Sequence, residues 1–206
     1  EERHAREEAE ALASARKSFL HLSKHAFSGL PKAYALELRT PDKLEGSLAY
    51  ELAQHGIAPA ATEPGAVSVT AQDLAPLLAC RSFFELLFPV ARKASAVPEL
   101  IARYAGAFLR ELLPAAHAGE PPFGYRIEVR GEDADRAALA KAVAAKLDGG
   151  LLVNAPGNYE AELRIELRRN GSADVFVKLY TIPDDRFAYR VRALPASIHP
   201  ATAAAV

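Results

Sequence analysis

The order of the predicted strands and helices places this chain in the α+β class. Strand, helix and strand follow one another in each half, and helices separate antiparallel strand pairs, whereas a wide parallel sheet needs a longer alternation of strands and helices. The chain has 206 residues, of which 50% are hydrophobic and 25% charged. Burial can therefore offset the entropy lost on folding, and the length suits one large domain or two small ones.

Composition excludes several classes of protein. No apolar run approaches the ~20 residues of a membrane-spanning helix. The single cysteine, Cys80, excludes an internal disulfide framework and a cysteine-rich zinc module. The formal net charge of -1 argues against a strongly basic nucleic-acid arm, although it leaves room for a local basic surface. We therefore expect a cytoplasmic protein with no membrane contact.

The two ends of the sequence suggest a piece of a longer protein. There is no methionine anywhere, and the last six residues, ATAAAV, are an apolar run that could start a helix. The charged beginning lacks the apolar segment of a signal peptide. We expect an excised piece, with a processed native protein as the alternative.

Residues 1–32 are expected to form an N-terminal helix and linker. The helix is indicated by apolar residues that recur every three or four positions: Leu12, Ala15, Phe19, Leu22 and Ala26. Gly29 and Pro31 are typical of the end of a helix. A packing helix and a helix that docks a partner protein both agree with this pattern.

Residues 33–116 are expected to form a first folded unit. Its elements are, in order, a strand at 33–39, a helix at 43–55, a strand at 65–71, a short helix ending near Cys80, a strand at 82–90 and a helix starting at Pro98. The apolar run at 82–90 is short enough that a helix also agrees with it. Thr70 and Asp73 are suited to cap the short helix.

The stretch from Pro114 to Pro122 is the clearest predicted linker, and a second unit, residues 117–196, is expected from there. Its elements are a strand at 123–130, a helix at 133–147 capped by Asp133 or Asp135, a strand at 151–154, a hairpin around Asn170-Gly171 and a strand at 187–192. Asn-Gly favours a type I′ turn, the tight connection of a β-hairpin. A further helix is expected to start near Pro200.

The sequence carries no motif of a reactive centre. Neither G-x-G-x-x-G nor G-x-x-x-x-G-K-[ST] occurs, so a phosphate-binding glycine loop is not supported. His21 and His25 have the spacing of a metal-binding pair, but without a third ligand beside them a solvent-facing pair is the simpler interpretation. Cys80 is expected to be a small buried hydrophobe, and Asp184 and Asp185 to be turn residues. We predict a binding module with no catalytic residue and no metal site in this chain.

The closing segment, DRFAYRVRALPASIHPATAAA at 185–205, resembles the domain junction of THUMP-domain RNA methyltransferases. In that family a hairpin ends in a Tyr-Arg pair, and a small-residue segment with a proline then opens the first helix of the methyltransferase domain. The matching positions are Tyr189, Arg190, Pro195, Ala196, Ser197, Pro200, Ala203 and Ala204.

Two earlier blocks are similar to the same family. The block at 123–180 has the THUMP order of a strand (FGYRIE), a helix and an Asn-Ala-Pro sequence before a hairpin. The block RTPDKLEGSLAYEL at 39–52, followed by GAVSV, is similar to the ferredoxin-like domain that precedes THUMP. The resemblance covers residues 33–206 and leaves the N-terminal helix outside.

The resemblance implies a division of the chain and a function. It implies a ferredoxin-like domain at 33–116, a THUMP domain at 117–196 and the start of a truncated methyltransferase domain at 197–206. Such enzymes bind RNA, often the acceptor end of tRNA, and members with this junction methylate an exocyclic amine of guanosine in tRNA or rRNA with S-adenosylmethionine. Their D-P-x-x-G-x-G loop and N-P-P-Y motif are absent here. The cofactor is therefore expected only in the full-length protein, with the methyltransferase domain of the same chain and an RNA as partners.

Basic and aromatic residues of the second unit are the candidates for RNA contact. Residues 121–206 carry 12 Lys and Arg against 11 Asp and Glu, whereas residues 33–120 carry 7 against 10. Arginine suits phosphate because its guanidinium is planar and always charged, and an aromatic ring can stack an unpaired base. The candidate RNA-binding residues are Arg126, Arg130, Lys178, Arg186, Tyr189, Arg190 and Arg192.

Other interpretations remain open from the sequence. Arg164, Arg168 and Arg169 could extend the RNA-binding surface, but Arg164, Glu166 and Arg168 also alternate as on any exposed strand face. A protein-interaction or adaptor module without an RNA role is one alternative function. The RNA-binding half of another THUMP enzyme, such as a thiouridine synthetase, is the other.

Overall fold

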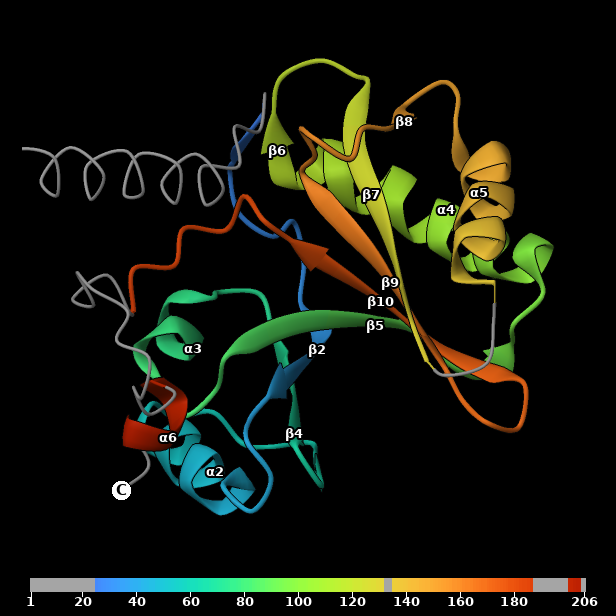
Figure 1. Ribbon diagram of the computed structural model, residues 1–206. Helices are drawn as coiled ribbons and strands as arrows, with labels where there is room; N and C mark the ends of the chain where they lie inside the picture. Colours follow the sequence, from blue (N-terminus) through green and yellow to red (C-terminus); the bar gives the residue numbers. More distant parts are fainter. Residues whose placement is uncertain (1–24, 132–134, 187–199, 205–206) are drawn as a thin grey trace, which may run out of the picture.

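The computed structural model describes residues 25–131, 135–186 and 200–204 (Figure 1). The strands are β1 (Ala26–Phe27), β2 (Tyr34–Arg39), β3 (Ala61–Glu63), β4 (Ala66–Ala71), β5 (Glu85–Ser95), β6 (His117–Ala118), β7 (Phe123–Arg130), β8 (Leu152–Asn154), β9 (Ala161–Leu167) and β10 (Ser172–Leu179). The helices are α2 (Glu45–Gln54), α3 (Ala75–Ala79), α4 (Pro98–Ala116), α5 (Arg136–Leu147) and α6 (Pro200–Ala204). None of these described helices is long and apolar enough to cross a membrane. The mixed sheet with its separate helices confirms the α+β class.

Eight strands form one sheet in the order β3-β4-β2-β5-β10-β9-β7-β8. β7 pairs in parallel with β8 and β9, and the other neighbours in this sheet are antiparallel. The long strand β5 belongs to both halves of the sheet, because Leu87 pairs with Glu37 of β2 while Ala91 pairs with Val175 of β10. Figure 1 shows β5 crossing the molecule between these two partners. Strands from before and after residue 116 therefore lie in one continuous sheet.

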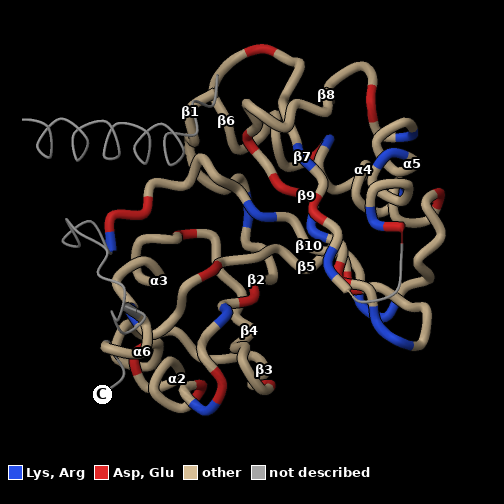
Figure 2. The backbone as a smooth tube through the Cα atoms, in the orientation of Figure 1, with Lys and Arg blue, Asp and Glu red and all other residues tan. Residues whose placement is uncertain are grey.

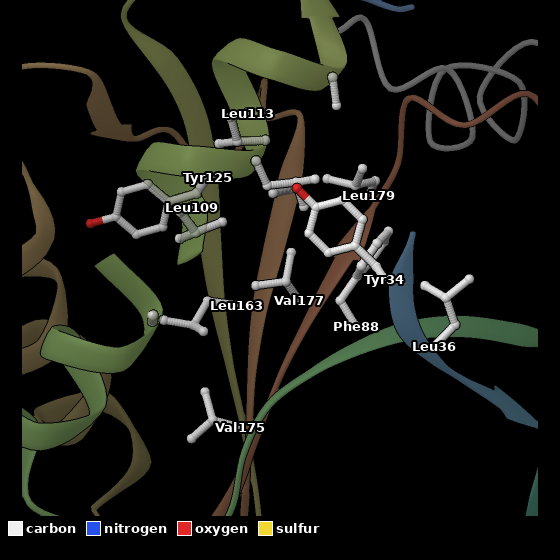
Figure 3. Close-up of a cluster of buried hydrophobic side chains, with 14 of the residues drawn as sticks. Tyr34, Leu36, Phe88, Leu109, Leu113, Tyr125, Leu163, Val175, Val177 and Leu179 are labelled. Atoms are coloured by element: carbon white, nitrogen blue, oxygen red, sulfur yellow. The ribbon is translucent and has the colours of Figure 1, made fainter. Parts of the chain in front are cut away.

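Apolar side chains from one face of the sheet and from the helices share a single core (Figure 3). Successive strand side chains point to opposite faces, so Val175, Val177 and Leu179 of β10 all lie on the core side. Leu109 and Leu113 of α4 belong to the same core and are completely buried. Burial of one such side chain stabilises the fold by about 1.5–3 kcal/mol. This core sets the orientation of each strand and so directs the alternate residues to the opposite face.

Several local predictions are confirmed. α4 begins at Pro98, β7 spans residues 123–130, and α6 begins at Pro200, all as the sequence patterns indicate. Asp135 caps α5, because its carboxylate accepts a hydrogen bond from the Ala138 N–H at 3.0 Å. The predicted strand at 82–90 is β5, which starts at Glu85 and continues to Ser95.

Two predicted boundaries are wrong. Pro114 is not in a linker but inside α4, which continues to Ala116. Ala116 is completely buried, and burial of this last turn outweighs the helical hydrogen bond that proline cannot donate. Ala26 is not on a helix but in β1, where β6 offers it a strand partner, Ala118. The remainder of the predicted N-terminal helix, residues 1–24, lies outside the described residues.

The β9–β10 hairpin is confirmed, but its turn type is wrong. A type I′ turn needs a positive φ at both central residues, and here Gly171 has a φ of 76° while Asn170 has no positive φ. The Gly171 N–H instead donates to the Arg168 carbonyl oxygen at 3.0 Å, so the turn spans 168–171. In this longer loop only glycine adopts the left-handed conformation, which costs it little because it lacks a Cβ. The predicted strand at 187–192 lies outside the described residues.

The structure also decides two predictions about single side chains. Cys80 is completely buried, as expected. His25 is buried as well, which contradicts its prediction as a solvent-facing residue; His21 lies outside the described residues. The His25 Nδ1 atom lies 3.0 Å from a carboxylate oxygen of Glu160, and Nε2 lies 2.9 Å from the main-chain oxygen of Glu120. These contacts attach His25, the residue directly before β1, to the second half of the chain.

Candidate nucleic-acid interface

The sheet face opposite the core, which we call the polar face, carries charged side chains on five adjacent strands. These side chains alternate with the core residues, as the pleat of a strand requires. They are Glu37 and Arg39 of β2, Glu85 and Arg92 of β5, Asp174 and Lys178 of β10, Glu162, Arg164 and Glu166 of β9, and Arg126, Glu128 and Arg130 of β7. Opposite charges on neighbouring strands stabilise such a sheet by pairing across it.

Arg164 lies at the centre of the polar face, with only 1% of its side chain exposed. Its Nη1 and Nη2 atoms donate to the two carboxylate oxygens of Glu85 at 2.5 and 2.8 Å. Its Nε and Nη2 atoms donate to Oε1 of Glu162 at 3.0 and 2.7 Å. A planar guanidinium with five N–H donors can bridge two carboxylates in this way. Arg164 thereby joins β9 to β5 across the intervening β10.

Arg126 and Lys178 meet around Tyr180, which directly follows β10. The Arg126 Nη2 atom donates to the Tyr180 hydroxyl at 2.9 Å. The Arg126 guanidinium carbon lies 5.2 Å from the ring centre of Tyr180 and 4.6 Å from that of Tyr159. The Lys178 ammonium lies 4.9 Å from the Tyr180 ring centre and donates to Glu85 at 2.9 Å. Cation–π and hydrogen-bond contacts therefore hold both cations in place.

On the β2 side, two guanidinium groups cover a buried ring. Phe176 is completely buried, and the guanidinium carbons of Arg39 and Arg92 lie 5.1 and 4.6 Å from its ring centre. Both arginines also form ion pairs with Glu37, whose side chain is only 2% exposed. The arginines thus lie above both the ring and the carboxylate.

The charges of the polar face are arranged in two layers. Four acidic side chains are at most 14% exposed: Glu37, Glu85, Glu162 and Asp174. Six basic side chains in or beside this group are 24–46% exposed: Arg39, Arg92, Arg126, Arg130, Arg168 and Lys178. Buried Arg164 and the more exposed Glu128 and Glu166 depart from this layering. The outer layer therefore presents mainly N–H donors, although the formal charges nearly cancel.

Two of the buried carboxylates, Glu85 and Glu162, stay ionised at neutral pH. Burial by itself would raise the pKa of Glu85, but hydrogen bonds and charge from Arg164 and Lys178 outweigh it and lower this pKa to about 2. Burial opposes ionisation of Glu162 too, but contacts with Arg126 and Arg164 lower its pKa to about 2. The basic layer therefore keeps its anionic support over the physiological pH range.

The structure brings together some of the predicted RNA-binding residues. Arg126 and Lys178 share the contacts around Tyr180. Arg130 lies on the same face at the end of β7, where its Nε atom donates to Glu128 at 2.8 Å. Three of the predicted residues lie outside the described part of the chain: Tyr189, Arg190 and Arg192.

Arg186 lies apart from this group, against the connection between α3 and β5. Its side chain is 5% exposed, and its guanidinium carbon lies 3.6 Å from the ring centre of Phe83. Its Nη1 atom donates to the main-chain oxygens of Cys80 and Phe83 at 3.1 Å each, and Nε and Nη2 donate to Asp184 at 2.7 Å. Arg186 thus attaches the chain after β10 to the first half of the molecule, and we do not retain it among the proposed RNA contacts.

Sequence reasoning missed several residues of the polar face. Arg164 is not an exposed strand residue, because Glu85 and Glu162 draw its guanidinium into the sheet. Tyr180 continues the alternation of β10 two positions after Lys178. A search for side chains at every second position could therefore have identified Tyr180. No sequence pattern around Glu85 indicates its contacts with Arg164 and Lys178, because they depend on where β5 lies in the sheet.

Comparison with solved structures shows the same fold in parts of larger proteins. A predicted N6-adenine-specific DNA methylase from Listeria monocytogenes str. 4b F2365 matches 84% of this chain and 47% of its own, with a TM-score of 0.56 and 16% identity. TrmN from Thermus thermophilus matches 82% of this chain and 52% of its own, with a TM-score of 0.54 and 21% identity. A 4-thiouridine synthetase in complex with RNA and ATP matches 72% of this chain and 42% of its own, with a TM-score of 0.50 and 12% identity.

These matches cover only part of each solved structure, and their sequence identity is low. No protein-family model and no curated protein matches the sequence. The chain spans about half the length of the solved structures that it matches. At these identities the likeness concerns the fold alone. It supports the fold that the sequence resemblance implies.

Proposed function

We propose that this chain is the RNA-binding module of an S-adenosylmethionine-dependent RNA methyltransferase. In this proposal it holds a tRNA acceptor end or an rRNA and positions a guanosine for methylation by a catalytic domain outside this chain. The observation that carries the proposal is the layered polar face, in which buried carboxylates support an outer layer of Arg and Lys side chains. The structural likeness to a predicted DNA methylase and to a synthetase solved with RNA supports a role in nucleic-acid modification.

The outer cations are suited to the sugar-phosphate backbone. Arg126, Arg130 and Lys178 would donate hydrogen bonds to phosphate oxygens, as Arg and Lys do in most nucleic-acid contacts. Buried carboxylates hold Arg126 and Lys178 in one arrangement, so less entropy is lost when RNA binds. Three contacts to single-stranded RNA correspond to a slope of about -2 in a plot of log affinity against log salt. We expect weak and salt-sensitive binding by this module alone.

The cofactor is proposed to bind outside this chain. The depressions of the described surface include one of about 440 Å³ between α4 and α5 and one of about 450 Å³ beside β3. The first is lined mainly by charged helix side chains such as Arg103, Arg110 and Lys146, and the second by residues such as Asp42 and Glu63. Neither includes a glycine-rich loop, so the residues present do not suit S-adenosylmethionine.

A second candidate is the RNA-binding half of a sulfur-transfer enzyme. The structural likeness to a 4-thiouridine synthetase favours it, and that protein was solved with RNA. The polar face would bind RNA in the same way in both cases. The coding sequence beyond Val206 distinguishes them, since a D-P-x-x-G-x-G loop followed by N-P-P-Y indicates a methyltransferase and an S-G-G-x-D-S loop indicates sulfur transfer.

The proposal is tested by titrating the 206-residue chain with unmodified tRNA, with and without its unpaired acceptor end, at low and moderate salt. We expect binding that weakens with salt and requires the unpaired end. Arg126→Gln and Arg130→Gln should each weaken binding and reduce the salt slope by about 0.7–1. Arg103→Gln on α4 removes the same charge on the helical side and should leave affinity unchanged.

Two results would contradict the proposal. The first is the absence of binding to tRNA at low salt. The second is equal affinity of the Arg126 and Arg103 variants, which would show that the polar face is not the binding surface. Charge reversal at Arg190 or Arg192 tests the predicted contacts beyond residue 186, and an unchanged affinity in both variants would exclude them.

A further inference from the structure

Asp174 organises a second group of basic side chains at the far end of the polar face. Its carboxylate is 4% exposed and accepts hydrogen bonds from the main-chain N–H of Lys93 at 2.7 Å and from Arg168 Nε at 2.9 Å. The Arg92 Nη1 atom lies 3.7 Å from the same carboxylate. Burial by itself would raise the pKa of Asp174, but the bonds from Arg168 and Lys93 outweigh it and lower this pKa. One buried anion therefore gathers basic residues of β5 and of the β9–β10 hairpin.

The backbone at Lys93 has an unusual conformation that this carboxylate holds. Lys93 has a φ of 50°, in the left-handed region that residues with a Cβ rarely adopt. The pairing of β5 with β10 also shifts register between Ala173 and Val175, so β5 is bulged here. Bulges redirect side chains, and strained positions persist only where neighbouring groups hold them. The result is an exposed lysine beside the hairpin arginines.

These residues form a basic surface, the hairpin patch, which consists of Arg92, Lys93, Arg168 and Arg169. Arg168 and Arg92 have 46% and 37% of their side chains exposed, and Lys93 and Arg169 are exposed residues. Besides Asp174, the acids whose charge acts on Arg168 are the half-buried Glu166 and the exposed Glu63. Figure 2 shows Lys and Arg at the free end of the β9–β10 hairpin. Positive charge thus exceeds negative charge among the exposed groups of the patch.

The hairpin patch lies far from Arg186, which follows β10 after the chain has left the sheet. Arg186 is attached to Phe83, just before β5, whereas Lys93 lies near the other end of β5. The eight residue-to-residue steps from Glu85 to Lys93 span about 26 Å at ~3.3 Å per step. Figure 1 likewise shows the hairpin end and α6 at opposite ends of the molecule.

We propose that the hairpin patch binds the phosphate backbone of a double-stranded part of the RNA, remote from the nucleotide that is modified. The inference rests on the proposed RNA-binding function and adds a second contact surface to it. None of the four patch residues is aromatic, and the neighbouring Phe176 is completely buried, so the patch offers no ring for stacking an unpaired base. Phosphate contacts of this type position a duplex without reading its sequence.

The test compares two RNAs and two matched double variants. Lys93→Glu with Arg169→Glu reverses two charges in the patch, while Arg103→Glu with Lys141→Glu reverses two exposed charges on α4 and α5. The RNAs are a complete folded tRNA and a short hairpin that carries only the unpaired end and a few base pairs. The patch variant should bind the tRNA at least about tenfold more weakly, with a salt slope reduced by about 2. It should bind the short hairpin within about twofold of the unsubstituted chain.

The single variant Lys93→Gly separates charge from backbone strain. Glycine adopts a φ of 50° readily, so this variant keeps the backbone conformation and loses the side chain with its ammonium group. It should bind the tRNA several-fold more weakly while far-UV circular dichroism stays unchanged.

The outcomes separate this inference from the proposed function. Equal tRNA binding by the patch variant and the α4/α5 variant overturns the hairpin patch and leaves the function standing. Equal losses on both RNAs also overturn it, because the patch would then act on the end rather than on a remote duplex. If the unsubstituted chain binds neither RNA, the proposed function fails and the inference fails with it.

Discussion

Replacing Arg164 with methionine should destabilise the fold strongly, because it leaves two buried carboxylates without their shared cation. Breaking a buried ion pair from one side costs about 3–5 kcal/mol. Here Glu162 keeps Arg126 and Glu85 keeps Lys178, so we expect the lower end, about 3 kcal/mol. This is a large part of the 5–15 kcal/mol that typically separates folded from unfolded domains.

The effect should depend on pH in a defined direction. The pKa values of Glu85 and Glu162 are lowered from 4.5 to about 2 in the folded protein. Their ionised forms therefore stabilise the fold above pH 4.5, and this contribution is lost as the pH falls toward 2. Without Arg164 both pKa values rise, so the stability of the variant should depend less on pH in this window.

The assay is urea unfolding followed by far-UV circular dichroism, at pH 7 and at pH 3. We expect the Arg164→Met variant to lose more stability at pH 7 than at pH 3. Arg130→Met is the control, since it removes one partner of a surface pair with 46% and 34% exposure and should cost at most about 1 kcal/mol. A free energy of unfolding equal to that of the unsubstituted chain at pH 7, or the same loss at both pH values, would refute the reasoning.

Four further substitutions test other parts of the fold. Gly124→Ala should lower stability by about 1–3 kcal/mol in thermal unfolding, because a Cβ would lie 2.6 Å from the main-chain oxygen of Asn158. Gly46→Ala in α2, where nothing lies within 4 Å, should instead raise stability by up to about 1 kcal/mol. Glu160→Gln removes the carboxylate charge beside His25, the residue directly before β1, so amide exchange in β1 should accelerate about tenfold or more, whereas unchanged protection would contradict this role. Lys93→Gly should raise the unfolding midpoint slightly while it weakens RNA binding, and a lower midpoint would show that the positive φ carries no strain.

Much of the secondary structure could be predicted from local patterns. The alternation at 123–130 predicts β7 correctly, and Asp135 caps α5 as expected. The prediction failed at Pro114, where the proline indicates a break but the last turn of α4 is buried in the core. It also failed at Asn170-Gly171, where the loop is longer than the dipeptide indicates.

The candidate site was predicted only in part. Arg126 and Lys178 were selected for their charge and their strand position, and the structure brings them to one face. The burial of Arg164 depends on Glu85, a residue 79 positions away, and no pattern within β9 reveals it. The same is true of Arg186, whose partners Cys80 and Phe83 are 106 and 103 positions away.

The sequence by itself determined the α+β class, the order of the longer elements and the apolar side of β7, β9 and β10. These properties depend on neighbours within one or two helical turns or one hairpin, where spacing and turn residues act directly. Only the tertiary structure decided that β5 joins both halves of one sheet and that carboxylates lie beneath the basic side chains. These features require residues far apart in the chain to meet at van der Waals distance, and burial in a shared core, rather than any local preference, brings them together.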